Sequence, residues 1–287
     1  MSIHPLSEVS PRAEIGADVE IGPFVIIEED TQIGDRCSIA GRVTIKRGTR
    51  LGCDNRIGEG AVLGGLPQHL NVIEHPGQLI VGDRNVIREN VTMHRAMTAD
   101  SATVLGDDCL IMVGAHLAHD CVVGNHVVLT NNVMLAGHVM VGDRAYLGGG
   151  AAVHQYCRVG RNAMVGGLAR IVQDVPPFMM IDGESNQVVG LNKVGLRRAG
   201  MTPLERNDLK EAYHLLYRQG YSWEELLATL EMRFTSGPAS EIGPFLRGTS
   251  RGYLRERRTP PKATIRLVRD EPTTADEPSI EPMRKVG

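Results

Sequence analysis

The chain has 287 residues, of which 42% are hydrophobic and only 4% aromatic, and its formal net charge is −3. This near-neutral charge argues against a nucleic-acid-binding protein, and we find no apolar stretch long enough to span a membrane. The N-terminus lacks the basic and apolar segments of a secretory signal, so we expect a cytoplasmic protein. A core with so few aromatic side chains must be built from Ile, Val and Leu, packed in a regular and narrow way.

From the N-terminus to Ile171, an aliphatic residue or Met recurs every six residues, in runs that begin at Ile3, Val81 and Leu105. The next residue is Gly in half of the repeats, which we interpret as a tight corner, and the fourth residue after the aliphatic one is usually small. Four of the five Cys occupy this small position, which favours buried thiols over disulfides or redox chemistry. These four are Cys37, Cys109, Cys121 and Cys157.

A period of six fits neither an α-helix nor a long strand, but it is typical of short strands wound into a parallel β-helix. Three six-residue sides would make one triangular coil of 18 residues, and successive coils would stack about 4.8 Å apart. We therefore predict a mainly β fold, with a β-helix over residues 1–190. Residues 64–80 and 96–104 interrupt the period and are expected to be loops, which often carry binding groups.

Helical signals replace the repeat after Pro177. Thr202 and Glu205 form a capping box around Pro203, and Ser222 and Glu225 form a second one. We expect a small α-helical C-terminal domain over residues 191–255, with a third short helix near 240–255. Residues 256–287 are rich in charges and Pro and are predicted to form a disordered tail.

The segment from His116 to Cys121 is the richest polar cluster of the chain. Leu117 occupies the inward position of its repeat, so we expect His119 and Asp120 to face outward from the middle of one side. These residues are the leading candidates for a functional site.

The 18-residue coil predicts which side chains lie above them. His119, Gly137 and Gln155 should form one row with a spacing of about 4.8 Å. Asp120 and His138 should form the neighbouring row. One side of the prism would thus collect two imidazoles, a carboxylate, an amide and a glycine backbone without a side chain.

This arrangement suits acyl transfer from a thioester to a hydroxyl group. A neutral His can accept the hydroxyl proton near pH 7, and a carboxylate beside it can fix its tautomer. The backbone N–H of Gly137 can stabilise the charge that develops on the carbonyl oxygen. Because a thioester is already activated, we expect no covalent Ser or Cys nucleophile, no metal and no cofactor beyond the thioester itself.

Five motifs, in this order, give the chain a specific resemblance to a family of hexapeptide-repeat acyltransferases, the UDP-N-acetylglucosamine 3-O-acyltransferases of lipid A synthesis. The likeness covers about residues 1–255. The motifs are His116-Leu-Ala-His119-Asp120-Cys121, Leu135-Ala-Gly137-His138, Val153-His154-Gln155, Met164-Val-Gly-Gly167 and Gln173-Asp-Val-Pro-Pro177.

The resemblance implies a left-handed β-helix and a homotrimer with its sites in clefts between subunits. It also implies transfer of a 3-hydroxyacyl group from acyl carrier protein to the 3-hydroxyl of UDP-N-acetylglucosamine, the first step of lipid A synthesis. In this family His119 would be the general base, Asp120 its orienting partner and the Gly137 N–H the oxyanion donor. Gly167 would gauge the acyl chain and, as a Gly, favour a longer one. Substrate-contacting positions would be Gln68, His116, His138, His154 (beside the acyl-carrier arm), Gln155, Asn192 and Arg198.

The chain departs from the family pattern at the acceptor. It has Gln68-His69-Leu70-Asn71 where the family usually has Gln-Asp-Leu-Lys, and Val194 replaces an acidic residue. Both charged sugar-contacting residues of that loop are therefore missing. UDP-N-acetylglucosamine and a different or amino-modified nucleotide sugar both stay open as acceptors.

Two other classes of function also stay open at this point. His116, His119 and His138 could ligate zinc, as in γ-type carbonic anhydrases, which are trimeric β-helices too. The chain could also be a non-catalytic β-helix scaffold, which would tolerate a His119→Ala substitution.

Overall fold

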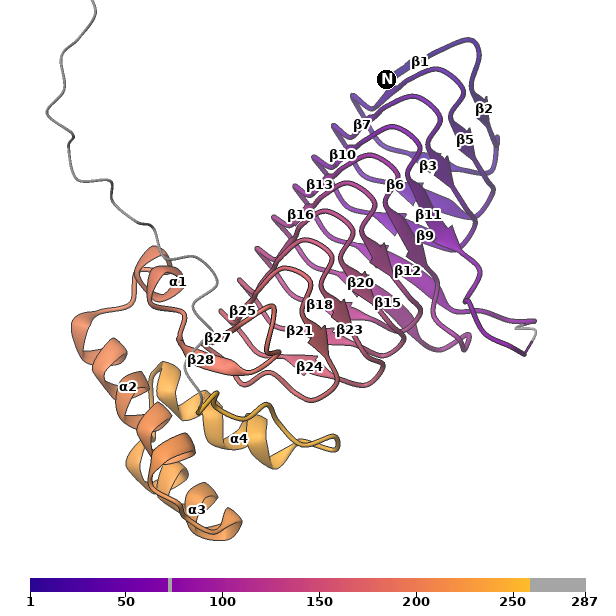
Figure 1. Ribbon diagram of the computed structural model, residues 1–287. Helices are drawn as coiled ribbons and strands as arrows, with labels where there is room; N and C mark the ends of the chain where they lie inside the picture. Colours follow the sequence, from indigo (N-terminus) through magenta and orange to yellow (C-terminus); the bar gives the residue numbers. More distant parts are fainter. Residues whose placement is uncertain (72–73, 259–287) are drawn as a thin grey trace, which may run out of the picture. The chain divides into compact units, whose positions relative to one another are not determined.

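The computed structural model describes residues 1–71 and 74–258 of the chain (Figure 1). Met1–Arg257 form one compact unit. Its strands wind into a regular coil that starts at the N-terminus, and helices follow at the C-terminal end (Figure 1). The strands lie in three sheets of eleven, nine and eight strands among the described residues, and these sheets are the three faces of a prism.

The first face contains β1 (Ser2–Ile3), β4 (Glu20–Ile21), β7 (Ser38–Ile39), β10 (Arg56–Ile57), β13 (Val86–Ile87), β16 (Leu110–Ile111), β19 (Val128–Leu129), β22 (Tyr146–Leu147), β25 (Met164–Val165), β27 (Met179–Ile181) and β28 (Val188–Leu191). The second face contains β2 (Glu8–Val9), β5 (Ile26–Ile27), β8 (Thr44–Ile45), β11 (Val62–Gly65), β14 (Thr92–His94), β17 (His116–Leu117), β20 (Met134–Leu135), β23 (Ala152–Val153) and β26 (Arg170–Ile171). The third face contains β3 (Glu14–Ile15), β6 (Thr31–Ile33), β9 (Thr49–Leu51), β12 (Gln78–Val81), β15 (Ala102–Leu105), β18 (Val122–Val123), β21 (Met140–Val141) and β24 (Arg158–Val159).

Strand pairing follows the predicted register. In the regular coils each strand pairs in parallel with the strand 18 residues further on, so that Leu117 lies beside Leu135 and Leu135 beside Val153. These aliphatic side chains point inward and are at most 2% exposed. Among the described strands, only β27 and β28 pair antiparallel. The narrow aliphatic core expected from the composition is therefore present.

The corners of the prism differ in detail from the prediction. The turn is centred on the second and third residues after the aliphatic one, and the third often has a left-handed backbone, with φ of 58° at Asp120 and 60° at His138. His119 and Asp120 thus lie at the corner between the second and third faces, and not in the middle of a side. Gly after the aliphatic residue serves close packing of successive coils, because a Cβ on Gly106 would lie only 2.8 Å from backbone atoms of Gly124.

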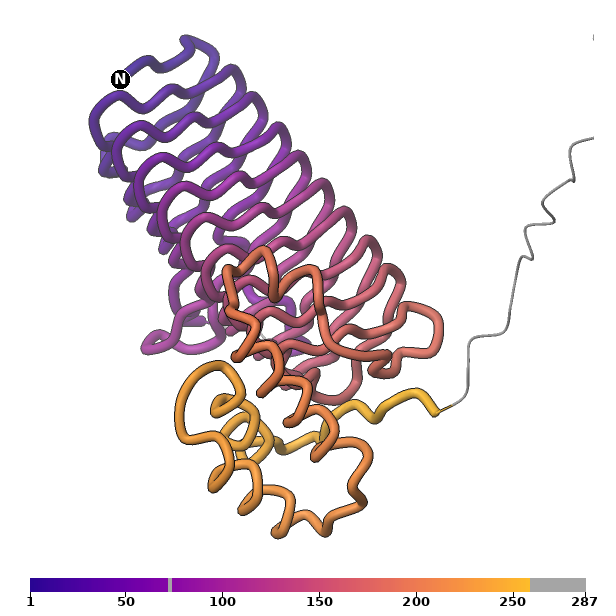
Figure 2. Tube along the Cα trace, turned by 90° about the vertical axis from the view of Figure 1, so that its left-hand side faces the viewer, coloured from indigo at the N-terminus to yellow at the C-terminus, as the bar shows by residue number. Residues whose placement is uncertain are grey.

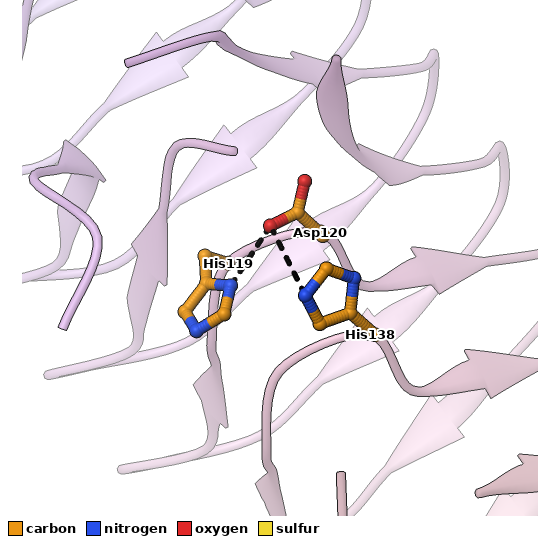
Figure 3. A group of neighbouring side chains, drawn as sticks. All are labelled: His119, Asp120 and His138. Carbon is orange, nitrogen blue, oxygen red and sulfur yellow. Dashed lines mark hydrogen bonds and ion pairs between the residues drawn. The ribbon is translucent and has the colours of Figure 1, made fainter. Parts of the chain in front are cut away.

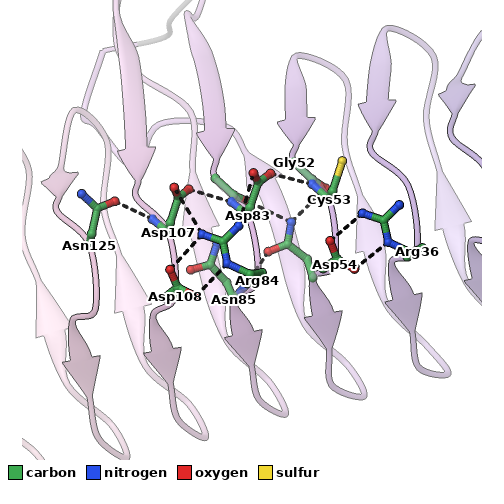
Figure 4. Close-up of polar contacts among 12 residues, drawn as sticks. Arg36, Gly52, Cys53, Asp54, Asp83, Arg84, Asn85, Asp107, Asp108 and Asn125 are labelled. Carbon is green, nitrogen blue, oxygen red and sulfur yellow. Dashed lines mark hydrogen bonds and ion pairs between the residues drawn. The ribbon is translucent and has the colours of Figure 1, made fainter.

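The corner between the third and first faces carries a polar ladder (Figure 4). Asp107 Oδ1 accepts a hydrogen bond from the backbone N–H of Asp83 at 2.8 Å, and Asn125 Oδ1 accepts one from Asp107 at 2.8 Å. Arg84 forms a two-pronged ion pair with Asp108 alongside. The ladder connects successive coils and explains why polar side chains repeat at this corner.

Both predicted loops are shorter than the sequence suggested. The first spans residues 66–77 and the second residues 95–101, because β12 and β15 pair with each other from Gln78 to Val81 and extend into both predicted segments. The strand pairing continues here although the six-residue period does not. Similarly, β27 adds one more parallel strand after Pro177, where the period had stopped.

The helical region follows the last coil (Figure 2). It consists of α1 (Lys193–Arg198), α2 (Pro203–Arg218), α3 (Trp223–Arg233), the 3-10 helix η1 (Pro238–Glu241) and α4 (Ile242–Arg247). Both predicted capping boxes are present, at Thr202 and at Ser222. Within the described part of the chain, no helix is long and apolar enough to cross a membrane.

The buried carboxylate of Asp174 fastens this region to the coil. It accepts hydrogen bonds from Arg158 Nε and Nη2 at 2.9 and 2.7 Å, and Arg158 Nη2 also donates to the carbonyl of Phe245. The predicted tail begins too early, since Glu256 bridges to Val188 and is part of the folded unit. The rest of the predicted tail, from residue 259, lies outside the described residues.

Candidate active site

The two leading candidates, His119 and Asp120, form a hydrogen-bonded pair at the corner between β17 and β18 (Figure 3). His119 Nδ1 lies 2.8 Å from Asp120 Oδ2, and the two side chains are 12% and 11% exposed. The pair is thus largely withdrawn from bulk water. Since Nδ1 faces the carboxylate, Nε2 is the nitrogen left to meet a substrate, which is the arrangement required of a general base.

The second loop holds the carboxylate of Asp120 from behind. Ser101 Oγ lies 3.0 Å from Oδ1, and the backbone N–H of Met97 donates to Oδ2 at 3.2 Å. The backbone N–H of Asp120 donates to Thr103 Oγ1 at 2.8 Å. Sequence reasoning missed these partners, because residues 96–104 have no six-residue repeat from which their positions follow. The break in the period at residue 96 was the only signal that this segment contributes.

Gly137 lies directly against the imidazole of His119. A Cβ at Gly137 would be 2.5 Å from Cε1 and 2.7 Å from Nε2 of that ring, so only Gly allows this approach. Among the described residues, the Gly137 N–H has no hydrogen-bond acceptor. A free donor beside a base is suited to stabilising an oxyanion.

His138 lies on the other side of Asp120, as the row predicted. Its Nε2 is 3.8 Å from Asp120 Oδ2, and its ring stacks on Tyr156 with centroids 4.6 Å apart. The His119 and His138 rings meet edge to face at 5.2 Å. His119, Asp120 and His138 each point a ligand atom toward the same small space, so these three residues could hold a metal ion (Figure 3).

A cavity of about 650 Å³ opens over the second face beside this pair. Apolar strand residues such as Met134, Leu135 and Val153 form part of its wall. It brings together six of the predicted site residues and one residue of the altered loop. These are Gln68, His116, His119, Gly137, His154 and Gln155, together with His69.

His116 is half-buried in this cavity, and its Nδ1 lies 2.8 Å from Thr92 Oγ1. Burial, and then the nearby ring of His94, lower the pKa of His116 to about 4. His116 is therefore neutral near pH 7 and can exchange hydrogen bonds with a polar substrate without adding charge.

The remaining predicted residues lie elsewhere. Asn192, Arg198 and Val194 line a cavity of about 450 Å³ on the first face, with Arg144 and Tyr146. Asn192 also caps α1, because its Oδ1 accepts from the Gly195 N–H and its Nδ2 donates to the carbonyl of Asn162.

Gly167 lines neither of these two cavities. The predicted substrate contacts thus fall on two faces of one prism, and a single chain does not bring them together.

Comparisons with known proteins agree with this geometry. A family model described as UDP-N-acetylglucosamine O-acyltransferase, domain 2, matches residues 174–254, and a bacterial transferase hexapeptide model matches residues 3–47 and 102–137. The acyl-[acyl-carrier-protein]–UDP-N-acetylglucosamine O-acyltransferases of Burkholderia lata and Halorhodospira halophila are each 42% identical to the chain. Each match covers 88% of this chain and 99% of the relative. The chain belongs to this acyltransferase family.

Solved structures of family members support the fold as well. The UDP-N-acetylglucosamine acyltransferase of Francisella novicida matches with a TM-score of 0.86 at 34% identity, over 89% of this chain and 95% of that one. The Moraxella catarrhalis enzyme matches with a TM-score of 0.85 at 37% identity, over 89% of this chain and all of that one. The predicted fold class, a left-handed parallel β-helix followed by a small helical region, is confirmed.

Proposed function

We propose that this member of the acyltransferase family moves a 3-hydroxyacyl group from acyl carrier protein to the 3-hydroxyl of UDP-N-acetylglucosamine, the first step of lipid A synthesis. One observation carries the proposal: His119, which is hydrogen-bonded to Asp120, lines a large cavity together with Gly137, whose N–H has no acceptor among the described residues. The family relatives named for this reaction share 42% identity over nearly their whole length.

The geometry suggests how each step would proceed. Nε2 of His119 takes the proton of the sugar hydroxyl as its oxygen attacks the thioester carbonyl carbon. The imidazolium that forms is stabilised by Asp120, and the Gly137 N–H donates to the carbonyl oxygen as it gains charge. When the tetrahedral intermediate collapses, the carbon–sulfur bond breaks and the thiol of the carrier leaves with the proton from His119. Written in this way, the step balances in atoms and charges with only the two substrates and these side chains.

The split of predicted residues between two faces supports a homotrimer. A cleft between two copies would place the first-face cavity with Arg198 opposite the second-face cavity with His119. Both faces also expose large apolar side chains near these cavities, with Tyr146 40% and Met134 49% exposed. Burial of such side chains between copies would favour association.

Mixed trimers test this arrangement. His119→Ala and Arg198→Ala chains are each expected to be inactive alone, and co-refolding them should restore part of the activity, because some clefts then contain both intact residues. Failure to restore activity in verified mixed trimers would contradict a site that is shared between copies.

The identity of the acceptor sugar depends on the altered residues that would contact it. His69 lines the cavity with its ring centroid 6.3 Å from that of His119, and Val194 lines the first-face cavity. An assay of 3-hydroxyacyl carrier proteins of several lengths against UDP-N-acetylglucosamine and its amino-sugar analogue identifies both substrates. We expect activity with UDP-N-acetylglucosamine and with the longer acyl chains. If only the amino analogue reacts, the acceptor is wrong while the mechanism stands.

The cluster of His119, Asp120 and His138 favours one alternative, a zinc enzyme. We propose instead that transfer needs no metal, because the contact between His119 Nδ1 and Asp120 Oδ2 orients the imidazole so that Nε2 can act as a base. Chelator-treated, metal-free protein should keep full transferase activity, and His119→Ala should lower it at least about 10²-fold. Stoichiometric zinc whose loss abolishes activity would support the alternative, and an unchanged His119→Ala variant would indicate a non-catalytic scaffold.

A further inference from the structure

We propose that the turn at residues 98–101 orients the catalytic pair and that Ser101 is its positioning residue. The inference rests on the proposed function, because it takes His119 to be the base. Ser101 touches neither the imidazole nor the cavity, so its effect would pass through Asp120. The deciding observation is the 3.0 Å contact between Ser101 Oγ and Asp120 Oδ1.

The two oxygens of Asp120 have different partners. Oδ2 faces His119 Nδ1 at 2.8 Å and also accepts from the Met97 N–H at 3.2 Å. Among the described residues, Ser101 is the only donor to Oδ1. The Asp120 backbone is already fixed by its left-handed φ and by the hydrogen bond to Thr103. The carboxylate of Asp120 can then still rotate about its side-chain bonds, and the hydrogen bond from Ser101 opposes this rotation.

The Ser101 hydroxyl has a choice of acceptors. Its one proton can reach the carbonyl of Thr98 at 2.9 Å or the carboxylate of Asp120 at 3.0 Å. A charged acceptor forms the stronger hydrogen bond, which favours donation to Asp120. The hydroxyl oxygen in turn accepts a hydrogen bond from Thr98 Oγ1 at 3.0 Å, which holds it in place beside the carboxylate.

The exit of the first loop supports the turn from the other side. The backbone N–H of Gln78 donates to the carbonyl of Ser101 at 3.1 Å, and the N–H of Gly77 donates to the carbonyl of Ala96 at 2.9 Å. A Cβ at Gly77 would overlap the carbonyl oxygens of Thr98 and Ser101, so the two backbones are in close contact. The turn is therefore a rigid support behind Asp120. Removal of the Ser101 hydroxyl should misalign His119 and leave substrate binding in the cavity unchanged.

The experiment compares Ser101→Ala with Ser101→Thr, which keeps the hydroxyl. A matched control is Ser185→Ala, since Ser185 Oγ also donates to a carboxylate, that of Asp182 at 2.8 Å, in the connection between β27 and β28. Each full-length variant is assayed for kcat, for KM of both substrates and for its thermal midpoint. We expect Ser101→Ala to lower kcat roughly tenfold with unchanged KM values and midpoint. Ser101→Thr should recover most of the rate, and Ser185→Ala should match the wild type.

A double-mutant cycle separates positioning from general loop support. If Ser101 acts through Asp120, then Ser101→Ala should cost nothing in an Asp120→Ala background. A loss that persists in that background, a Thr variant as slow as the Ala variant, or an unchanged Ser101→Ala rate would each overturn the proposal.

A wild type without transferase activity would refute the proposed function instead. The positioning of His119 would then be read from its Nδ1 proton in NMR spectra, which should be seen in the wild type and in Ser101→Thr and be lost in Ser101→Ala. A signal retained in Ser101→Ala would overturn the proposal on this readout too.

Discussion

Replacement of Gly137 by Ala is the sharpest test of the site, because the change adds a single methyl group and keeps the backbone N–H. The added Cβ would lie 2.5 Å from Cε1 of His119, whereas ordinary carbon contacts need about 3.5 Å. The imidazole must therefore move by about 1 Å. A displacement of this size costs about 10²-fold in rate, or about 2.7 kcal/mol in the barrier.

The assay is steady-state acyl transfer by the purified protein, with kcat and both KM values. Gly149→Ala is the matched control, since Gly149 takes the same place in its repeat at another corner, and a Cβ there would meet its nearest neighbour at an ordinary 3.5 Å. We expect the Gly137 variant to keep its thermal midpoint and to lose kcat, while the Gly149 variant keeps both. The reasoning is refuted if Gly137→Ala retains a rate within about threefold of wild type. It is also refuted if Gly137→Ala lowers the rate of a His119→Ala variant by the same factor as that of the wild type, because the loss would then not pass through His119.

Three further outcomes follow from burial and charge. Asp174→Ala should lower the free energy of unfolding by about 3 kcal/mol in urea titrations, because it leaves Arg158 without its buried partner. In contrast, Glu211→Ala removes an exposed pair with Arg233 on helix α2 and should cause no measurable change. Burial lowers the pKa of His116 from its usual 6.5 to about 4. As the pH drops, the unfolded chain therefore binds a proton at His116 before the folded chain does. The free energy of unfolding should fall between pH 6.5 and 4, and it should fall less in His116→Gln. Equal falls in both proteins would contradict the lowered pKa of His116. Burial raises the pKa of Cys109 to about 11 and that of Cys121 to about 12, so a thiol reagent at pH 8 should modify the partly exposed Cys53 in the native protein and leave these two intact, as peptide mapping would show.

The repeat made much of the site predictable. Because each coil advances the chain by 18 residues, the position of His119 in its repeat placed Gly137 beside it and His138 beside Asp120, and the structure has both contacts. The family motifs added the left-handed winding of the β-helix and the identity of the reaction. The six-residue period supplies neither.

Positions outside the repeat could not be predicted in the same way. Ser101 and Met97 are four residues apart in a segment without periodicity, and their contacts with Asp120 exist because β12 and β15 pair and close the loop over the corner. The corner itself was also misplaced, because a six-residue period gives the spacing of the turns but not which residues adopt a left-handed backbone. Asp120 does so with φ of 58°, which turns its carboxylate toward the loop.

The sequence by itself determined the coil, its aliphatic core and the row of polar residues, since each depends only on spacing along the chain. The tertiary structure decided which groups hold Asp120, how tightly Gly137 packs against His119, and that Arg198 and Asn192 lie on a different face from His119. These facts depend on where the non-repeating segments pack against the prism. Their positions are set by backbone pairing and packing between residues far apart in sequence, which a local sequence pattern does not reveal.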